Sequence, residues 1–99
     1  MPPGPPYFVY ILSNSTRTVL YIGMTNGLRR RLREHQSGRG SAFVDQYNTV
    51  DLVYFETYDT PKAAIEREKQ LKRWRRDKKE ALIRSVNPTL ETLSAPVES

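Results

Sequence analysis

The sequence predicts a small mixed α/β (α+β) fold in which three strands pack with about three helices. Two apolar and aromatic runs, YFVYILS and VLYIGM, are separated only by the turn-rich stretch SNSTRT. A third run, DLVYFETY, has strand composition, and two other segments repeat apolar residues at the spacing of a helix face. The 99 residues suffice for one domain with one modest core.

The N-terminal elements can be assigned in order. Residues 1–6, MPPGPP, cannot form the interior of a strand or helix, so we expect a poorly ordered lead-in. Structure should begin at Tyr7, and the first two apolar runs should pair as a hairpin. Asn26 is a plausible cap for a helix from Leu28 to about Ser37, which two glycines then end.

The second half begins with a loop and the third strand, Asp51 to Tyr58. Thr60 as cap, with Pro61 at the first helical position, predicts a helix that runs to about Trp74. A short final helix should cover about Asp77 to Val86.

These elements place a single domain at 7–86. The remaining residues, 87–99, contain Pro96 and few apolar side chains, which predicts a loosely attached tail.

The charge distribution favours a polyanionic partner. Lys and Arg total 16 against 11 acids, a net charge of +5, and the segment EREKQLKRWRRDKKE from Glu66 to Glu80 is densely basic. Such density attracts phosphate backbones, although a solvated helix face would have the same composition. The absence of cysteine excludes disulfides and thiolate zinc sites. With no apolar run near the roughly 18 residues of a membrane span, we expect a cytoplasmic protein with no membrane association.

The first helix carries two charged or polar residues on its inward face. Leu28, Arg31, Leu32 and His35 follow the i, i+3, i+4, i+7 spacing, so the two leucines turn Arg31 and His35 toward the domain. A buried unpaired charge is unfavourable by several kcal/mol, so Arg31 needs a partner or a cleft. The outer side of the helix carries Arg29, Arg30 and Arg33.

The second long helix repeats this anomaly. Glu68 lies in the stripe formed with Ala64, Ile65 and Leu71, whereas Glu66 falls on the solvent side. Two interpretations stay open: Glu68 and Arg31 form a structural ion pair, or they belong to a functional cleft with His35.

Two tyrosines accompany these charges. Tyr10 lies in the middle of the first strand, and Tyr21 shares one face of the second strand with Gly23. A glycine there lets another group approach the backbone closely. Each tyrosine taken alone is more often a core residue than a catalytic one.

Together these residues resemble the GIY-YIG nucleases. Val9-Tyr10-Ile11 stands where that family has its first triplet, with valine in place of glycine, and Tyr21-Ile22-Gly23 matches the second. The resemblance covers roughly Tyr7 to Trp74. The run from Tyr21 to His35 is most similar to the structure-specific endonuclease branch and to the small stand-alone bacterial members. Met24 stands where excision-repair relatives carry a lysine, so a mechanism assisted by that lysine is not expected.

The site residues also fall at family positions. Arg31 lies eight positions after Gly23 and His35 twelve after it, and Glu68 follows Ala64 at the spacing of the family's helical glutamate. The resemblance implies a three-stranded antiparallel sheet packed among helices, with phosphodiester cleavage that uses one Mg²⁺ or Mn²⁺.

The same resemblance implies a role for each residue. Glu68 would ligate the metal, and Arg31 would neutralise charge at the scissile phosphate. Tyr21 or Tyr10 would position or deprotonate the attacking water. His35 would assist by hydrogen bonding or would itself be the base, and the sequence does not decide between them. A single carboxylate suffices for Mg²⁺ when waters and substrate phosphate fill its other positions.

We therefore expect a metal-dependent endonuclease, acting on DNA and as a second substrate RNA, with structure rather than sequence selectivity and a setting in DNA repair. A protein partner could supply substrate selectivity, and Trp74 could stack on a base or pack the helix end. The alternatives are a nucleic-acid-binding module without catalysis and an adaptor whose basic helix docks on an acidic protein. The side chains expected to hold the nucleic-acid backbone are Arg29, Arg30, Arg33, Lys69, Lys72, Arg73 and Arg76.

Overall fold

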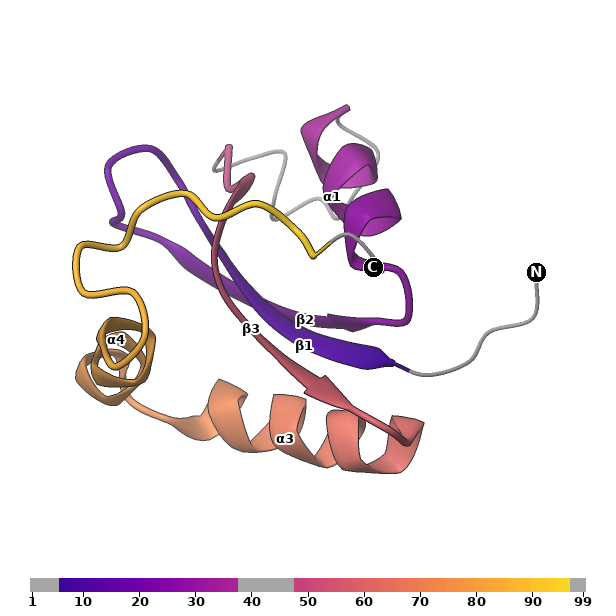
Figure 1. Cartoon of the computed structure of the whole chain (residues 1–99). Helices are drawn as coiled ribbons and strands as arrows, with labels where there is room; N and C mark the ends of the chain where they lie inside the picture. The colour runs from indigo at the N-terminus through magenta and orange to yellow at the C-terminus, as the bar shows by residue number, and fades with distance from the viewer. Residues whose placement is uncertain (1–5, 38–47, 97–99) are drawn as a thin grey trace.

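A three-stranded antiparallel sheet forms the centre of the molecule (Figure 1). The computed structural model describes residues 6–37 and 48–96; residues 1–5, 38–47 and 97–99, which hold most of the expected lead-in, most of the loop and the end of the tail, lie outside this description. The strand order is β2-β1-β3, so the most apolar strand is central. The strands are β1 Tyr7–Ser13, β2 Leu20–Thr25 and β3 Asp51–Tyr58.

Three helices accompany the sheet in the described residues: α1 Leu28–Gln36, α3 Pro61–Arg73 and α4 Arg76–Arg84. The Thr60 hydroxyl accepts from the Ala63 amide at 3.2 Å, which confirms the predicted cap of α3. The predicted Asn26 cap of α1 is wrong: Gly27 is the cap residue, and the Asn26 side chain instead accepts from the Arg30 guanidinium at 3.3 Å.

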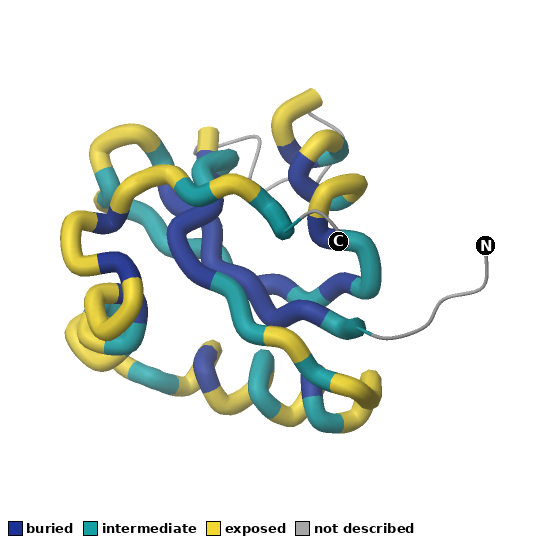
Figure 2. Tube along the Cα trace, viewed as in Figure 1, coloured by how far each residue is buried: buried dark blue, intermediate teal, exposed yellow. Residues whose placement is uncertain are grey.

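The two faces of the sheet carry different layers. Val9 and Ile11 of β1 face α3 and α4, whereas Phe8, Tyr10 and Leu12 face α1. This alternation is the period-2 geometry of a strand buried on both sides. In Figure 1, α1 lies on one side of the sheet and α3 on the other, and Figure 2 shows the buried residues concentrated in the strands between them.

The segment after α4 packs against the sheet. The Leu93 amide donates to the Leu52 carbonyl at 2.7 Å, and the Asn87 side chain donates to the Val53 carbonyl at 2.9 Å. Leu90 is buried, and the segment crosses the sheet on the α1 side (Figure 1). The sequence predicted a loosely attached tail. Within residues 87–96, however, Asn87, Leu90 and Leu93 attach the segment to the sheet, although it forms neither a helix nor a strand.

None of the described helices is long and apolar enough to cross a membrane.

Candidate active site

Tyr10 lies at the centre of the candidate site. Its Cα partner across the β1–β2 ladder is Gly23, and its ring covers that glycine so closely that an added Cβ would lie 2.5 Å from the Tyr10 Cζ atom. The side chain is therefore buried, with 1% of the residue exposed. Gly23 is needed here for the close approach of a ring to backbone.

The inward face of α1 meets this ring. His35 is buried, at 1% exposure, and its Nε2 atom lies 3.1 Å from the Tyr10 hydroxyl. The rings of Tyr10, Tyr21 and His35 contact one another in pairs, with centroids 5.7–6.4 Å apart. Two strands and one helix thus bring three polar rings together, and Tyr21, which is only partly buried, is the most accessible of them.

Arg31 joins the cluster from the same helix. The hydrogen bond with Tyr10 is the main cause that raises the pKa of Arg31, and a second bond, from its Nη1 atom to Glu34 Oε1 at 3.0 Å, adds to it. Burial raises the pKa of Tyr10 to about 12, although the hydrogen bond with Arg31 opposes the rise. At neutral pH Tyr10 therefore keeps its proton and Arg31 keeps its charge.

Glu68 lies in the opposite helix layer. It lies on α3, which packs on β1 and β2, and its side chain is 21% exposed. Its carboxylate pairs with the Lys72 ammonium at 3.3 Å, one turn along the same helix. Besides burial, which is the main cause, the negative charge of Glu68 contributes to the raised pKa of Tyr10, so the two groups lie within electrostatic range.

The structural ion pair between Arg31 and Glu68 is not formed among the described residues. Each of these two side chains instead has a partner on its own helix, Glu34 and Lys72 respectively. Ion pairs of this kind, between exposed or half-exposed residues one turn apart, contribute only about 0.3–0.5 kcal/mol. Both charges can therefore change partners easily when a ligand arrives.

The donor set fits a weakly held hard cation. Within residues 6–37 and 48–96 no three acidic or histidine side chains gather as a metal cage. Glu68 offers one partly exposed carboxylate, and its present partner, Lys72, has a 56% exposed side chain whose ammonium water can solvate when the pair separates. Mg²⁺ retains several waters and binds through one or two carboxylates plus phosphate oxygens, so a single glutamate suits it.

Six of the seven predicted nucleic-acid-binding residues are exposed on α1 or α3. Arg29, Arg30 and Arg33 are exposed on α1, and Lys69, Lys72 and Arg73 are exposed on α3. Arg76 is different, because its guanidinium donates to the carbonyls of Arg17 and Thr18 and to Glu80 Oε2. These bonds attach α4 to the β1–β2 turn, and because the Arg76 side chain is still 44% exposed, a role in the nucleic-acid interface stays a prediction.

One polar network was not anticipated from the sequence. Glu56 on β3 accepts two hydrogen bonds from Arg67 on α3, both 2.9 Å long, and further ones from the hydroxyls of Tyr54 and Tyr58. Burial alone would raise the pKa of Glu56, but these hydrogen bonds outweigh it and lower the pKa. In the sequence, the only sign of this network was a glutamate, Glu56, inside an apolar strand pattern, and that sign does not indicate that Arg67 is its partner.

Comparison with known proteins identifies the family. The model of the GIY-YIG catalytic domain matches residues 6–81, three quarters of the chain. The chain belongs to the GIY-YIG family. Tyr10, Tyr21, Arg31, His35 and Glu68 all lie within the matched range.

Curated GIY-YIG relatives of similar size extend this assignment. A UPF0213 protein of Haloquadratum walsbyi is 41% identical over 76 residues, which is 77% of this chain and 84% of the relative. A UPF0213 protein of Bacillus pumilus is 34% identical over 80 residues, 81% of each chain. The solution NMR structure of the UPF0213 protein BH0048 from Bacillus halodurans is 28% identical, with a TM-score of 0.54 and coverage of 84% of this chain and 87% of that one.

These comparisons make the protein a member of a nuclease family whose domain implies binding of nucleic acid. The name UPF0213 specifies neither an activity nor a substrate.

Proposed function

We propose that this GIY-YIG protein is an endonuclease that hydrolyses phosphodiester bonds in DNA, selecting its substrate by structure, with Mg²⁺ or Mn²⁺ at Glu68. The observation that carries the proposal is the cluster of Tyr10, Tyr21 and His35, in which the Tyr10 hydroxyl lies 3.1 Å from His35 Nε2, together with Arg31 one turn before His35 on the same helix. A protein that only bound nucleic acid would need exposed cations, but it would have no use for an arginine held inward against a buried phenol.

Arg31 is the residue we assign to the scissile phosphate. A guanidinium is planar and permanently charged, so it can donate two parallel hydrogen bonds to phosphate oxygens. Tyr10 and Glu34 support it from two sides, which limits the rotamers it can adopt. A phosphate would take the place of Glu34, and Tyr10 would keep the guanidinium in position.

Tyr10 and His35 act in this account as positioning residues. Both are buried, and a phenol whose pKa is raised to about 12 is a poor base at neutral pH. When Tyr10 accepts from Arg31, its own O–H can donate to His35 Nε2. This arrangement needs a neutral histidine with the proton on Nδ1.

Tyr21 is the phenol we assign to the attacking water. Its ring packs against His35 with centroids 5.7 Å apart, and the residue is only partly buried, so its hydroxyl can reach a substrate. It would orient the water by hydrogen bonding.

Glu68 would hold the divalent cation, which when bound polarises a phosphate oxygen and stabilises the charge that develops on the leaving oxygen. Lys72 would then be released to neutralise a neighbouring phosphate. The exposed cations of α1 and α3 would hold the nucleic-acid backbone without reading bases. We also propose that RNA is a second substrate and that a protein partner supplies substrate selectivity. Cleavage of flapped or branched DNA would suit a cytoplasmic role in DNA repair.

A nicking assay tests this function. The purified chain is incubated with single-stranded, duplex, flapped and branched DNA and with RNA, in Mg²⁺, Mn²⁺ or chelator. Glu68→Gln should abolish metal-dependent cleavage, and Asp59→Asn, which neutralises an exposed carboxylate just before α3 and outside the proposed sites, should cleave like the wild type. Strong binding of these substrates without cleavage of any of them would replace the nuclease with a binding module.

A further inference from the structure

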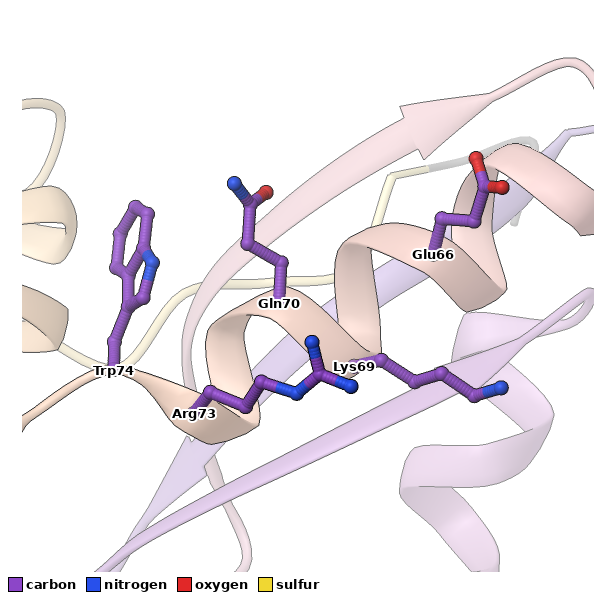
Figure 3. A pocket seen from close by; sticks show the side chains of 5 residues that line it. All are labelled: Glu66, Lys69, Gln70, Arg73 and Trp74. Carbon is purple, nitrogen blue, oxygen red and sulfur yellow. The ribbon is translucent and has the colours of Figure 1, made fainter.

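A hollow lies on the outer side of α3. It has a volume of about 390 Å³ and is lined by Glu66, Lys69, Gln70, Arg73 and Trp74, all shown in Figure 3. We call it the Trp74 pocket. None of these side chains is one that we assign to the cleavage step. Tyr10, Tyr21, Arg31 and His35 lie on the α1 side of the sheet, and Glu68, although it lies on α3, does not line the pocket.

Arg67 contacts two of the residues that line the Trp74 pocket, Gln70 and Trp74. Arg67 is held by its two bonds to Glu56, and from that position its Nη1 atom donates to Gln70 Oε1 at 2.7 Å. The same guanidinium lies 5.1 Å from the centroid of the Trp74 ring. One partly buried guanidinium therefore contacts both the amide and the aromatic ring that line the pocket.

The lining has the chemistry of a nucleotide site. Trp74 offers an aromatic surface, and Gln70, whose oxygen is already used, has its NH₂ group left to donate. Glu66 can accept from an exocyclic amine of a base. The cations of Lys69 and Arg73 extend along the same side of α3 in Figure 3, where a phosphate could lie between them.

We infer that the Trp74 pocket binds an unpaired nucleotide, with its base against the indole and its phosphate at Lys69 and Arg73. A duplex cannot occupy it in the same way, because its bases are already stacked and paired. The inference rests on the proposed nuclease function and deepens it. The substrate class becomes nucleic acid with a single-stranded stretch beside the cut.

The position of the pocket along α3 suits this role. Trp74 follows Glu68 by six residues, roughly 9 Å along a helix axis, which corresponds to about three nucleotide steps at the 3.4 Å rise of one DNA strand. At about 100° per residue the pocket residues lie on the side of α3 away from Glu68, so a strand that leaves the cleavage site would cross the helix before it reaches the pocket.

Lys78 also contacts the Trp74 ring. Its exposed ammonium lies 4.2 Å from the Trp74 centroid, although Lys78 does not line the pocket. With Arg67 at 5.1 Å, this contact shows that the indole is a surface on which other groups can lie.

The single tryptophan of the chain makes the test direct. Intrinsic fluorescence is titrated in chelator with an oligodeoxyadenylate of about eight nucleotides, within the site size of single-strand binders. A blunt duplex of matched length is the comparison. We expect saturable quenching by the single strand and little by the duplex. An RNA octamer of the same sequence should behave like the DNA, because the proposed contacts do not involve the sugar. Equal quenching by single strand and duplex, or none by either, would overturn the inference.

Variants separate stacking from folding. By fluorescence anisotropy of a labelled strand, Trp74→Ala should weaken single-strand binding about tenfold, and Trp74→Phe should restore it to within about threefold of the wild type. Val86→Ala removes an exposed apolar side chain outside the pocket and should bind normally. Wild-type affinity in Trp74→Ala would contradict the pocket.

These measurements are independent of cleavage. Quenching by single strands from a chain that cuts nothing would support the pocket and remove the nuclease. Cleavage by a chain without single-strand preference would leave the nuclease and remove the pocket.

Discussion

The ring of Tyr10 lies directly on Gly23, its partner across the β1–β2 ladder, with no space for a side chain between them. The Tyr10 hydroxyl contacts His35 and Arg31, both of which lie on α1. The absence of a Cβ on one strand therefore sets the position of the residues on α1 that we assign to the phosphate.

Gly23→Ala should damage both stability and activity. The added Cβ would lie 2.5 Å from Tyr10 Cζ and Oη, so the ring or the strands must move. Overpacking of this kind usually destabilises by about 1–3 kcal/mol. Denaturant unfolding and the nicking assay measure the two effects.

Gly27→Ala is the matched control. Its Cβ would meet only the end of the Arg30 side chain, at 3.2 Å, and that side chain can turn away. Equal losses in the two alanine variants would show that the Tyr10–Gly23 contact has no special role.

The two tyrosines should respond differently to loss of their hydroxyl groups. Tyr10→Phe leaves buried His35 Nε2 without its hydroxyl partner, so we expect about 1 kcal/mol of lost stability together with lower activity. Tyr21→Phe should lower the cleavage rate with little change in stability, since the residue is only partly buried. Unfolding curves and single-turnover cleavage rates of both variants test this difference. The reverse pattern would assign Tyr10 to the attacking water and Tyr21 to positioning.

Much of the fold was predictable because its signals are local. The apolar run of β1 indicated a strand buried on both faces, and Thr60 with Pro61 located the start of α3. Helical pitch alone turned Arg31 toward the domain. Asn26 failed as a cap because Gly27 takes that position and the amide turns to Arg30.

The partners of long side chains were not predictable, since they depend on how distant elements meet. Arg17 adopts a positive φ of 58° and binds Asp51 at 2.6 Å and the Leu90 carbonyl at 2.8 Å, across 34 and 73 residues. Arg67 likewise finds Glu56 only once α3 lies beside β3. No spacing in the sequence encodes either pair, so composition alone did not distinguish the arginines with structural partners from those that are exposed.

Glu56 should give the protein a defined acid limit. A glutamate in the unfolded chain has a pKa near 4.3, and the hydrogen bonds from Arg67, Tyr54 and Tyr58 hold the folded pKa of Glu56 below its ordinary value despite its burial. The folded state therefore binds fewer protons in this window. The stabilisation is full above about pH 5 and is lost as the pH falls through the lower folded pKa.

Glu56→Gln should flatten that loss and destabilise the protein at neutral pH by about 1–3 kcal/mol, because Arg67 loses its charged acceptor. Unfolding free energies between about pH 3 and 7 measure both. Glu66→Gln is the exposed control. A pH profile in Glu56→Gln that parallels the wild type would contradict the assignment.

Lys72 should compete with the cation for Glu68. Removing its charge in Lys72→Gln frees the carboxylate of a partner 3.3 Å away, so Mn²⁺ affinity should rise roughly two- to tenfold. Mn²⁺ binding followed by electron paramagnetic resonance reports this without any cleavage. Lys69→Gln, an exposed neutralisation on the same helix, should change the affinity less. Lower affinity in Lys72→Gln than in Lys69→Gln would contradict the competition.

The central claim is that Arg31 acts on the scissile phosphate whereas its neighbours only hold the backbone. Single-turnover cleavage and binding in chelator are compared for Arg31→Gln and Arg30→Gln, two changes of equal charge at adjacent positions. The account predicts a loss of about 100-fold or more in rate for Arg31→Gln with affinity within a few-fold of the wild type, and a near-normal rate at saturation for Arg30→Gln. Equal rates for the two variants would contradict it.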